Sequence, residues 1–320
     1  MHRPPTAAAL SVTAALLLTA CGGPDADRAK DTARPTTPTG VTAQAGSATS
    51  AHVMWERSTD DTAVTGYEVL HDGRRVASVP AARNMVDVER LAPSTAYRFT
   101  VRARDAAGNL SAPSAAVSVT TPPSVRDDRT PPTRPPALRG MVEGTGAVTL
   151  TWGRAADAAG VTAYDVYQAD SRVHSVPGRA TTARVTHLRP GTVYTFTVRA
   201  RDAADNSSPD SPSVDLTTAP AAGSGPSTAP TGLTATARPG GVALSWTPPA
   251  TGAPVKEHQL FLDGALATTI VWGAQPPPGP VHYTFTVTDR PGTRYTVKLR
   301  ARLPDGTWGD FSAQRTVVTR

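Results

Sequence analysis

The chain has little cysteine, glutamate or lysine. Cys21 is the single cysteine among 320 residues, so no disulfide can form within the chain. Small domains without disulfides must be held by hydrophobic cores of their own. The same scarcity excludes CxxC zinc motifs, and the seven histidines lack H-x-x-x-H and H-E-x-x-H spacing. We therefore expect neither a metal centre nor a cofactor.

Motifs of catalysis are also missing. The sequence contains no G-x-S-x-G, Walker or dinucleotide-binding motif. Glycoside hydrolysis requires two carboxylates that face each other across a cleft, yet only five glutamates are present. The adjacent pairs Asp60–Asp61 and Asp127–Asp128 fall in a predicted loop and a predicted linker, where we expect solvated turn residues. We predict that the protein is not an enzyme, with a hydrolase as the alternative to test.

One segment is repeated almost unchanged. Phe99–Ser114 reads FTVRARDAAGNLSAPS, Phe196–Ser211 reads FTVRARDAADNSSPDS, and a looser copy spans Tyr295–Ser312. Three tryptophans that each end an alternating apolar run lie 97 and 94 residues apart: Trp55, Trp152 and Trp246. Repeats of about 100 residues suit a β-sandwich rather than the shorter units of a helical solenoid.

The pattern within each copy indicates strands joined by tight turns. Apolar and polar residues alternate with a period of two, as on a half-buried strand. Asp72-Gly73 and Asp263-Gly264 each separate two such runs, and Asp-Gly favours a type I′ hairpin because both turn residues need positive φ. Because no helical period is visible beyond the N-terminus, we predict an all-β fold of three tandem antiparallel β-sandwiches.

Two segments carry a family resemblance. Leu91-Ala-Pro-Ser-Thr-Ala-Tyr97 and Leu188-Arg-Pro-Gly-Thr-Val-Tyr194 resemble the L-x-P-x-T-x-Y segment of immunoglobulin-like fibronectin type III domains. The resemblance implies that Tyr97, Tyr194 and Tyr295 form tyrosine corners, in which the hydroxyl bonds back to nearby backbone. It also implies that Trp55, Trp152 and Trp246 are core anchors. The third copy departs from the pattern, because Asp289 stands where the leucine is expected.

Segments rich in proline, glycine, serine and threonine separate the predicted domains. The predicted organisation is a signal peptide at 1–20, a linker at 21–36, fibronectin type III-like domains at 37–121 and 134–218, a proline-rich linker at 122–133, a second linker at 219–229, and a divergent third domain at 230–320.

The N-terminus predicts export and a lipid anchor. A short basic start is followed by an apolar run from Ala7 to Ala20, which is too short to span a bilayer but suits a signal peptide. The run ends Leu18-Thr-Ala-Cys21, which resembles the bacterial lipobox. The resemblance implies that Cys21 is lipidated and holds the protein on the extracytoplasmic face of the cell membrane. The alternative is an ordinary signal peptide.

One predicted strand in each domain displays cations outward. These residues are Arg98, Arg102 and Arg104; Arg199 and Arg201; and Arg294, Lys298, Arg300 and Arg302. Such a basic stripe could attract an anionic cell-wall polymer or lipid head groups. The alternative is cross-strand pairing with Glu68 or Asp165 on the neighbouring strand. We do not expect nucleic acid as a partner, because no aromatic residues are interleaved with the arginines.

Two further tryptophans, Trp272 and Trp308, both fall in the third domain. An exposed indole can stack on a sugar or contact a partner protein, whereas the alternative is that Trp272 covers the core edge and Trp308 packs on its own loop. We predict a non-catalytic cell-surface lipoprotein that acts as scaffold, spacer or binding module, with polysaccharide, cell-wall polymer or a surface protein as partner. The resemblance to fibronectin type III domains, which are often attached to bacterial secreted polysaccharide hydrolases, implies a second hypothesis: an accessory role in polysaccharide degradation. The oligomeric state is left open.

Overall fold

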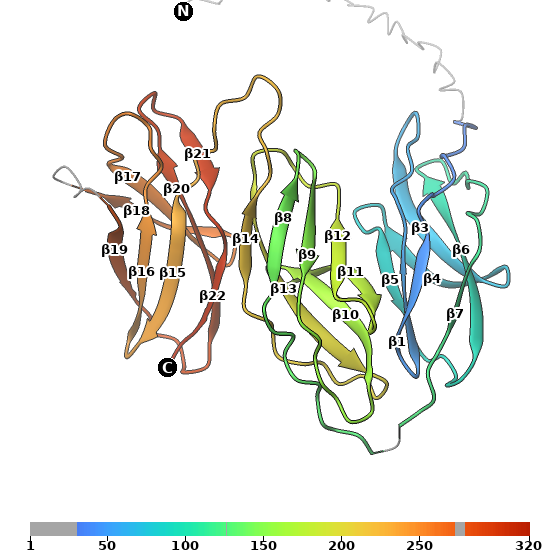
Figure 1. Ribbon diagram of the computed structural model, residues 1–320. Helices are drawn as coiled ribbons and strands as arrows, with labels where there is room; N and C mark the ends of the chain where they lie inside the picture. The colour runs from blue at the N-terminus through green and yellow to red at the C-terminus, as the bar shows by residue number, and fades with distance from the viewer. Residues whose placement is uncertain (1–30, 126, 273–278) are drawn as a thin grey trace, which may run out of the picture.

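The structure is a computed structural model that describes residues 31–125, 127–272 and 279–320. Within these ranges all regular secondary structure is β-strand, and the strands form three sandwiches in chain order (Figure 1). The predicted all-β fold of three tandem antiparallel sandwiches is therefore confirmed. No helix in the described part of the chain is long and apolar enough to cross a membrane. The predicted signal peptide and Cys21 lie outside the described residues.

We call the three sandwiches modules one, two and three. Module one pairs its strands in the orders β1-β2-β5 and β4-β3-β6-β7. Its strands are β1 (Thr42–Ser47), β2 (Ser50–Met54), β3 (Val64–His71), β4 (Arg74–Pro80), β5 (Met85–Val88), β6 (Ala96–Asp105) and β7 (Val117–Thr120).

Module two repeats the same topology, with the orders β8-β9-β12 and β11-β10-β13-β14. Its strands are β8 (Arg139–Glu143), β9 (Ala147–Thr151), β10 (Val161–Gln168), β11 (Ser171–Pro177), β12 (Thr182–Val185), β13 (Val193–Asp202) and β14 (Val214–Thr217).

Module three has the order β15-β16-β19 in one sheet and β18-β17-β20-β21 in the other, where β22 also pairs with β20. Its strands are β15 (Thr231–Arg238), β16 (Gly241–Thr247), β17 (Glu257–Leu262), β18 (Ala265–Val271), β19 (Val281–Thr286), β20 (Arg294–Arg302), β21 (Trp308–Phe311) and β22 (Arg315–Val318).

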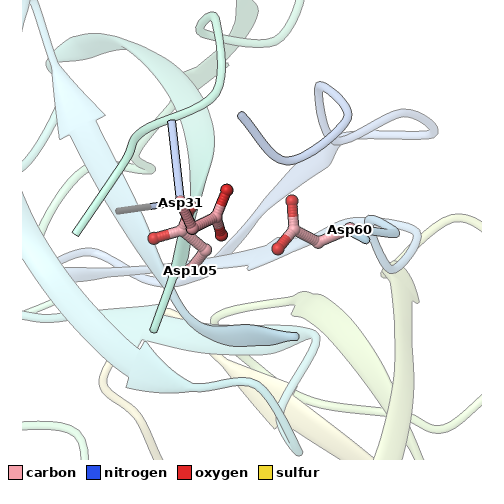
Figure 2. Close-up of side chains that lie close together, drawn as sticks. All are labelled: Asp31, Asp60 and Asp105. Atoms are coloured by element: carbon pink, nitrogen blue, oxygen red, sulfur yellow. The ribbon is translucent and has the colours of Figure 1, made fainter. Parts of the chain in front are cut away.

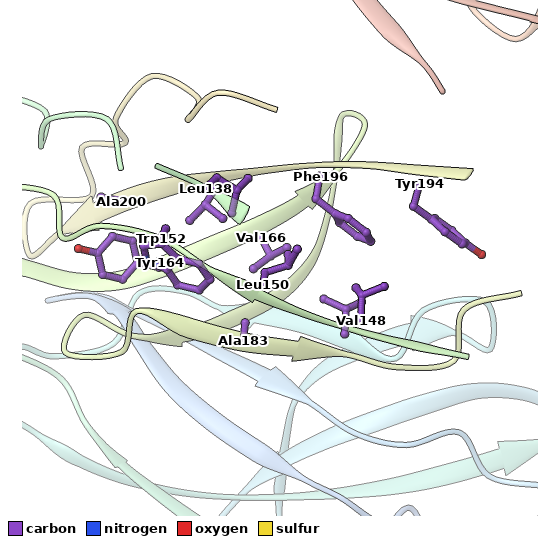
Figure 3. Packing of buried hydrophobic residues seen from close by; sticks show 12 residues of the cluster. Leu138, Val148, Leu150, Trp152, Tyr164, Val166, Ala183, Tyr194, Phe196 and Ala200 are labelled. Atoms are coloured by element: carbon purple, nitrogen blue, oxygen red, sulfur yellow. The ribbon is translucent and has the colours of Figure 1, made fainter. Parts of the chain in front are cut away.

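Each module closes its two sheets around one tryptophan. In module two, Leu150 of β9 and Trp152, which directly follows this strand, face Val166 and Phe196 of the opposite sheet (Figure 3). Trp55 and Trp246 occupy the same place in the other two cores and are 2% and 1% exposed. Burial of such a side chain stabilises a fold by roughly 1.5–3 kcal/mol, so each module can hold itself together without disulfides.

The two Asp-Gly hairpins have the backbone conformation that the sequence predicts. The φ angles of Asp72 and Gly73 are 46° and 78°, and those of Asp263 and Gly264 are 49° and 83°. Positive φ at both positions matches a type I′ turn, whose twist suits the flanking strands. The turns therefore fix the register of β3 with β4 and of β17 with β18.

The tyrosine hydroxyl accepts a backbone hydrogen bond in modules one and two, but it donates to a side chain in module three. The backbone N–H of Ala92 donates to the Tyr97 hydroxyl at 2.7 Å, and that of Arg189 donates to the Tyr194 hydroxyl at 2.7 Å. In module three the Tyr295 hydroxyl donates instead to the Asp289 carboxylate. Asp289, which stands where the leucine is expected, thus provides a side-chain partner for the tyrosine hydroxyl in place of the backbone partner found in the other two modules.

Modules one and two lie side by side, with strand β1 of module one against the larger sheet of module two (Figure 1). The backbone N–H of Ala48 donates to the carbonyl of Ala203 at 2.9 Å, and the hydroxyl of Thr162 donates to the carbonyl of Gly46 at 2.8 Å. Modules two and three also touch, through an ion pair between Arg315 and Asp215. The linkers therefore join modules that contact one another directly.

Candidate functional site

The outer face of the larger sheet in module three carries several cations. Along β20, Val297 and Leu299 are fully buried. Because successive side chains of a strand point to opposite faces, Lys298, Arg300 and Arg302 face outward. Residues 230–320 contain nine basic and five acidic residues, a net charge of +4 within a chain of net charge +6. Most of the excess positive charge therefore lies in this module.

Three aromatic rings stand among these cations. The Arg300 guanidinium lies 5.4 Å from the ring centre of Trp308 and 5.1 Å from that of Phe311. It also lies 5.4 Å from the ring centre of Phe261, and the Lys298 ammonium lies 4.3 Å from that of Phe311. We call this set the aromatic–cationic face: Phe261, Lys298, Arg300, Arg302, Trp308 and Phe311.

The polar groups of this face are only partly engaged. Arg302 pairs with Glu257 at 3.0 Å, and the Arg300 Nε donates to the Gln259 Oε1 at 2.9 Å. Within the described residues, no carboxylate lies within ion-pair distance of Lys298 or Arg300. All three rings are half-buried and keep part of their surface in solvent. The face therefore offers both apolar ring surface and hydrogen-bond donors to a ligand.

The basic stripe of modules one and two is largely neutralised. Arg102 pairs with Glu68 and Arg201 with Asp165, each at 2.7 Å, as the cross-strand alternative predicts. Burial raises the pKa of Glu68, but hydrogen bonds and charge from Arg102 and Arg75 outweigh it, so the net pKa is lowered. These cations are held by carboxylates and are poorly placed to attract a polymer.

The remaining members of the stripe are scattered. Arg199 pairs with Asp210 at 2.7 Å, and Arg294 reaches Asp170 of module two. Arg98 and Arg104 of β6 are exposed. The nine cations therefore do not form one continuous surface, and the cluster in module three stands apart because aromatic rings accompany it.

Trp272 and Trp308, the two candidate ligand-binding tryptophans predicted from the sequence, lie in different environments. Trp308 belongs to the aromatic–cationic face. Trp272 instead packs on the core, with its ring centre 6.5 Å from that of Trp246, and its indole N–H donates to the His258 Nδ1 at 3.4 Å. The expectation of a ligand-facing indole at Trp272 is corrected by this packing, because its ring surface is used against the core.

Three aspartates converge at one end of module one (Figure 2). Asp31 precedes β1, Asp60 lies between β2 and β3, and Asp105 ends β6, yet their ligand atoms lie within 4.8 Å of one another. The sequence predicts Asp60 to be a solvated turn residue and gives no separate expectation for Asp31 or Asp105, whereas the structure brings the three together. A second group with the same composition stands in module two: Asp128, Asp157 and Asp202. Among the described residues, these two groups bring acidic side chains close enough together to hold a metal ion.

The signal that could have revealed these clusters was present in the repeats. Each member of the second group lies 97 residues after its counterpart in the first. The residue before the first strand, the residue in the loop and the residue at the strand end are thus aspartate in both modules. Spacing along the chain did not show that the three positions meet, because they are up to 74 residues apart in the sequence.

A cavity of about 640 Å³ lies between modules one and two. Met54 and Trp55 line it from one side, and His174 and Tyr194 line it from the other. Burial, with a contribution from the charge of His52, lowers the pKa of His174. Glu56 is the only acid among the described residues that line the cavity, so it does not present the opposed carboxylates of a glycoside hydrolase.

Comparison with known families finds one match. The fibronectin type III domain model matches residues 36–120 and 131–216, which together exceed half of the chain. The three-domain segment FN1–FN3 of chicken CNTN1 covers 89% of this chain and 99% of that structure, at 16% identity and a TM-score of 0.26.

Curated relatives are bacterial enzymes. Chitinase A1 of Niallia circulans is 40% identical over 59% of this chain, and exoglucanase B of Cellulomonas fimi is 42% identical over 61%. The chain spans only 26% and 18% of the length of these two relatives. The similarity therefore concerns their fibronectin type III regions.

Proposed function

We propose that this chain, which belongs to the fibronectin type III domain family, is a non-catalytic surface protein that binds polysaccharide and assists its breakdown. The aromatic–cationic face of module three carries this proposal. Two relatives of the chain are named chitinase and exoglucanase, so chitin and cellulose are the first polymers to test. The modules themselves would position this face at a distance from the cell.

The chemistry of the face suits a sugar chain. The C–H face of a sugar ring can stack on an aromatic ring, and Trp308 and Phe311 retain exposed ring surface for it. Sugar hydroxyls accept hydrogen bonds, and the Arg300 guanidinium and the Lys298 ammonium are donors with no bound carboxylate among the described residues. A few polar groups set among aromatic rings is the usual composition of a small-ligand site.

The test is a sedimentation assay of the full chain with insoluble chitin and cellulose. We expect Trp308→Ala to weaken binding about tenfold, which corresponds to about 1.4 kcal/mol. Met141→Ala is the matched control, because this side chain is 63% exposed but lies in module two. A Trp308→Ala protein that sediments like the parent chain would refute the assignment of the face.

We also propose that the protein is attached to the outer face of the membrane through lipid on Cys21. The sequence Leu18-Thr-Ala-Cys21 supports this proposal, and two or more acyl chains give stable anchoring. Detergent phase separation of expressing cells is the test. The parent protein should enter the detergent phase and Cys21→Ser the aqueous phase; a parent protein in the aqueous phase would exclude the anchor.

A further inference from the structure

The two aspartate clusters are built alike. The Asn109 side-chain amide donates to the Asp105 carboxylate at 2.7 Å and to the Asp31 carbonyl at 3.0 Å. In module two the Asn206 amide donates to the Asp202 carboxylate at 2.8 Å and to the Asp128 carbonyl at 3.2 Å. Each asparagine therefore holds the segment before its module against the end of a core strand.

The negative charge of these clusters is not balanced by a positively charged side chain of the described residues. Asp105 is 2% exposed and Asp202 is fully buried. Among the described residues, no lysine, arginine or histidine forms an ion pair with any of the six aspartates of the clusters. A buried charge is strongly unfavourable unless it is paired or coordinates a metal, and three carboxylates within 4.8 Å of one another also repel.

The carboxylate of Asp105 is held in place by donors from the loop that follows it. The side-chain amide of Asn109 donates to its Oδ2 at 2.7 Å, and the backbone N–H of Asn109 donates to its Oδ1 at 2.8 Å. Hydrogen bonds of this kind orient the carboxylates that hold a metal ion.

A separate observation concerns one oxygen of Asp60. Its Oδ2 accepts the hydroxyl of Thr62 at 2.8 Å, whereas its Oδ1 exposes less than 1 Å² and has no hydrogen-bond partner. Figure 2 shows the carboxylate of Asp60 turned toward those of Asp31 and Asp105. A buried carboxylate oxygen cannot be satisfied by two other carboxylates, because these groups only accept hydrogen bonds. A cation placed between the three carboxylates would satisfy it.

We propose that each cluster binds one calcium ion. Carboxylate and carbonyl oxygens are the ligands that calcium prefers, and its coordination tolerates irregular arrangements of them. The ion would be held by Asp31, Asp60 and Asp105 in module one, and by Asp128, Asp157 and Asp202 in module two. Calcium sites of extracellular modules bind with dissociation constants of about 0.1–1 mM, and we expect this range here.

Calcium would couple each module to the chain that precedes it. Asp31 and Asp128 lie before the first strand of their modules, whereas the other two ligands of each cluster belong to the sandwich. Bridging these positions fastens the linker to the end of the module. In module two the fastened segment is the proline-rich linker, so calcium would stiffen the connection between the first two modules.

Module three provides an internal comparison. Its loop has the same backbone bond, because the N–H of Leu303 donates to the carbonyl of Thr307 as that of Asp105 does to the carbonyl of Asn109. The buried aspartate is thus replaced by Leu303. The loop position five residues after the core tryptophan is Thr251 instead of aspartate. Two ions per chain are therefore expected, not three.

Equilibrium dialysis of the full chain against radioactive calcium tests the stoichiometry. We expect two ions per chain, and one ion each for Asp31→Asn and for Asp128→Asn, whose positions outside the sandwiches leave the folds intact. The double variant should bind at least tenfold more weakly at both sites. Asp61→Asn and Asp127→Asn are matched controls, because each neighbours a cluster residue without belonging to a cluster, and both should bind like the parent.

A second measurement does not depend on those variants. Calcium at 10 mM, about tenfold or more above the expected dissociation constants, should raise the unfolding temperature of the parent chain, and magnesium should raise it less. An absence of bound calcium in the parent, unchanged binding by the double variant, or tighter binding of magnesium than of calcium would each overturn the proposal. Asp60→Asn and Asp157→Asn must each lose one bound calcium ion, as Asp31→Asn and Asp128→Asn do.

Discussion

Trp272 donates its indole N–H to the Nδ1 of His258, which is fully buried beside Trp246. In modules one and two, tyrosines occupy the place of His258 against the core tryptophan, and the position of Trp272, identified by its backbone bond, holds a small residue. The corresponding residues are Tyr67 and Ala81 in module one, and Tyr164 and Gly178 in module two. Module three thus exchanges a large ring on β17 for a smaller one and fills the space from the end of β18.

Removal of the Trp272 indole should destabilise module three without affecting ligand binding. Trp272→Ala should lower its free energy of unfolding by about 2–4 kcal/mol, because a packed aromatic ring is replaced by a cavity. Denaturant unfolding of the full chain, followed by tryptophan fluorescence, measures the change. Trp308→Ala should lose less than about 1 kcal/mol and lose polysaccharide binding instead. Equal stability of the two variants would contradict the assignment of Trp272 to the core.

Module three should be sensitive to mild acid. Burial lowers the pKa of His258 to about 4, and its Nε2 has no hydrogen-bond partner. Between pH 6.5 and 4 the unfolded chain binds a proton that the folded module does not, so stability falls as the pH falls through this window. The loss should reach about 3 kcal/mol at pH 4. Urea unfolding at several pH values gives the slope.

The control for this pH dependence lies in the same module. His258→Gln should flatten the slope between pH 6.5 and 4, because the titrating group is gone. His282→Gln should leave it unchanged, since His282 is exposed. A slope that survives in His258→Gln would assign the acid sensitivity to other groups.

The contact between modules one and two depends on Asp87. Its carboxylate accepts from the buried His52 at 2.8 Å and pairs with Arg172 of module two. Burial raises the pKa of Asp87, but His52 and Arg172 lower it further than burial raises it. Asp87→Asn should weaken the coupling between the modules by about 1–3 kcal/mol. Small-angle scattering should then show a more extended particle, whereas Asp72→Asn, in an exposed hairpin, should not change the profile.

The tyrosine corners should differ in strength. Tyr97→Phe and Tyr194→Phe remove the acceptor of a backbone N–H and should each cost about 1 kcal/mol of unfolding free energy. Tyr295→Phe should have a smaller effect, because its hydroxyl meets an exposed carboxylate. Thermal unfolding of the three variants checks this order. A loss for Tyr295→Phe as large as for the other two would show that the Asp289 contact is an equivalent corner.

The sequence alone determined the local structure and the repeat. Alternation along Phe99, Val101 and Ala103 determined which side of β6 is buried, because a strand turns successive side chains to opposite faces. Asp72-Gly73 determined a turn, since few other pairs adopt two positive φ angles. These features depend on neighbouring residues, so they can be read from a single chain.

Tertiary structure decided which distant side chains meet. Arg201 meets Asp165, Trp272 covers the core, and Trp308 stands beside Arg300. The aspartates of each cluster come from a linker, a loop and a strand end, and sequence spacing places none of them near the others. Such contacts depend on how two sheets pack and how one module rests on the next, and the energies that select them act through space rather than along the chain.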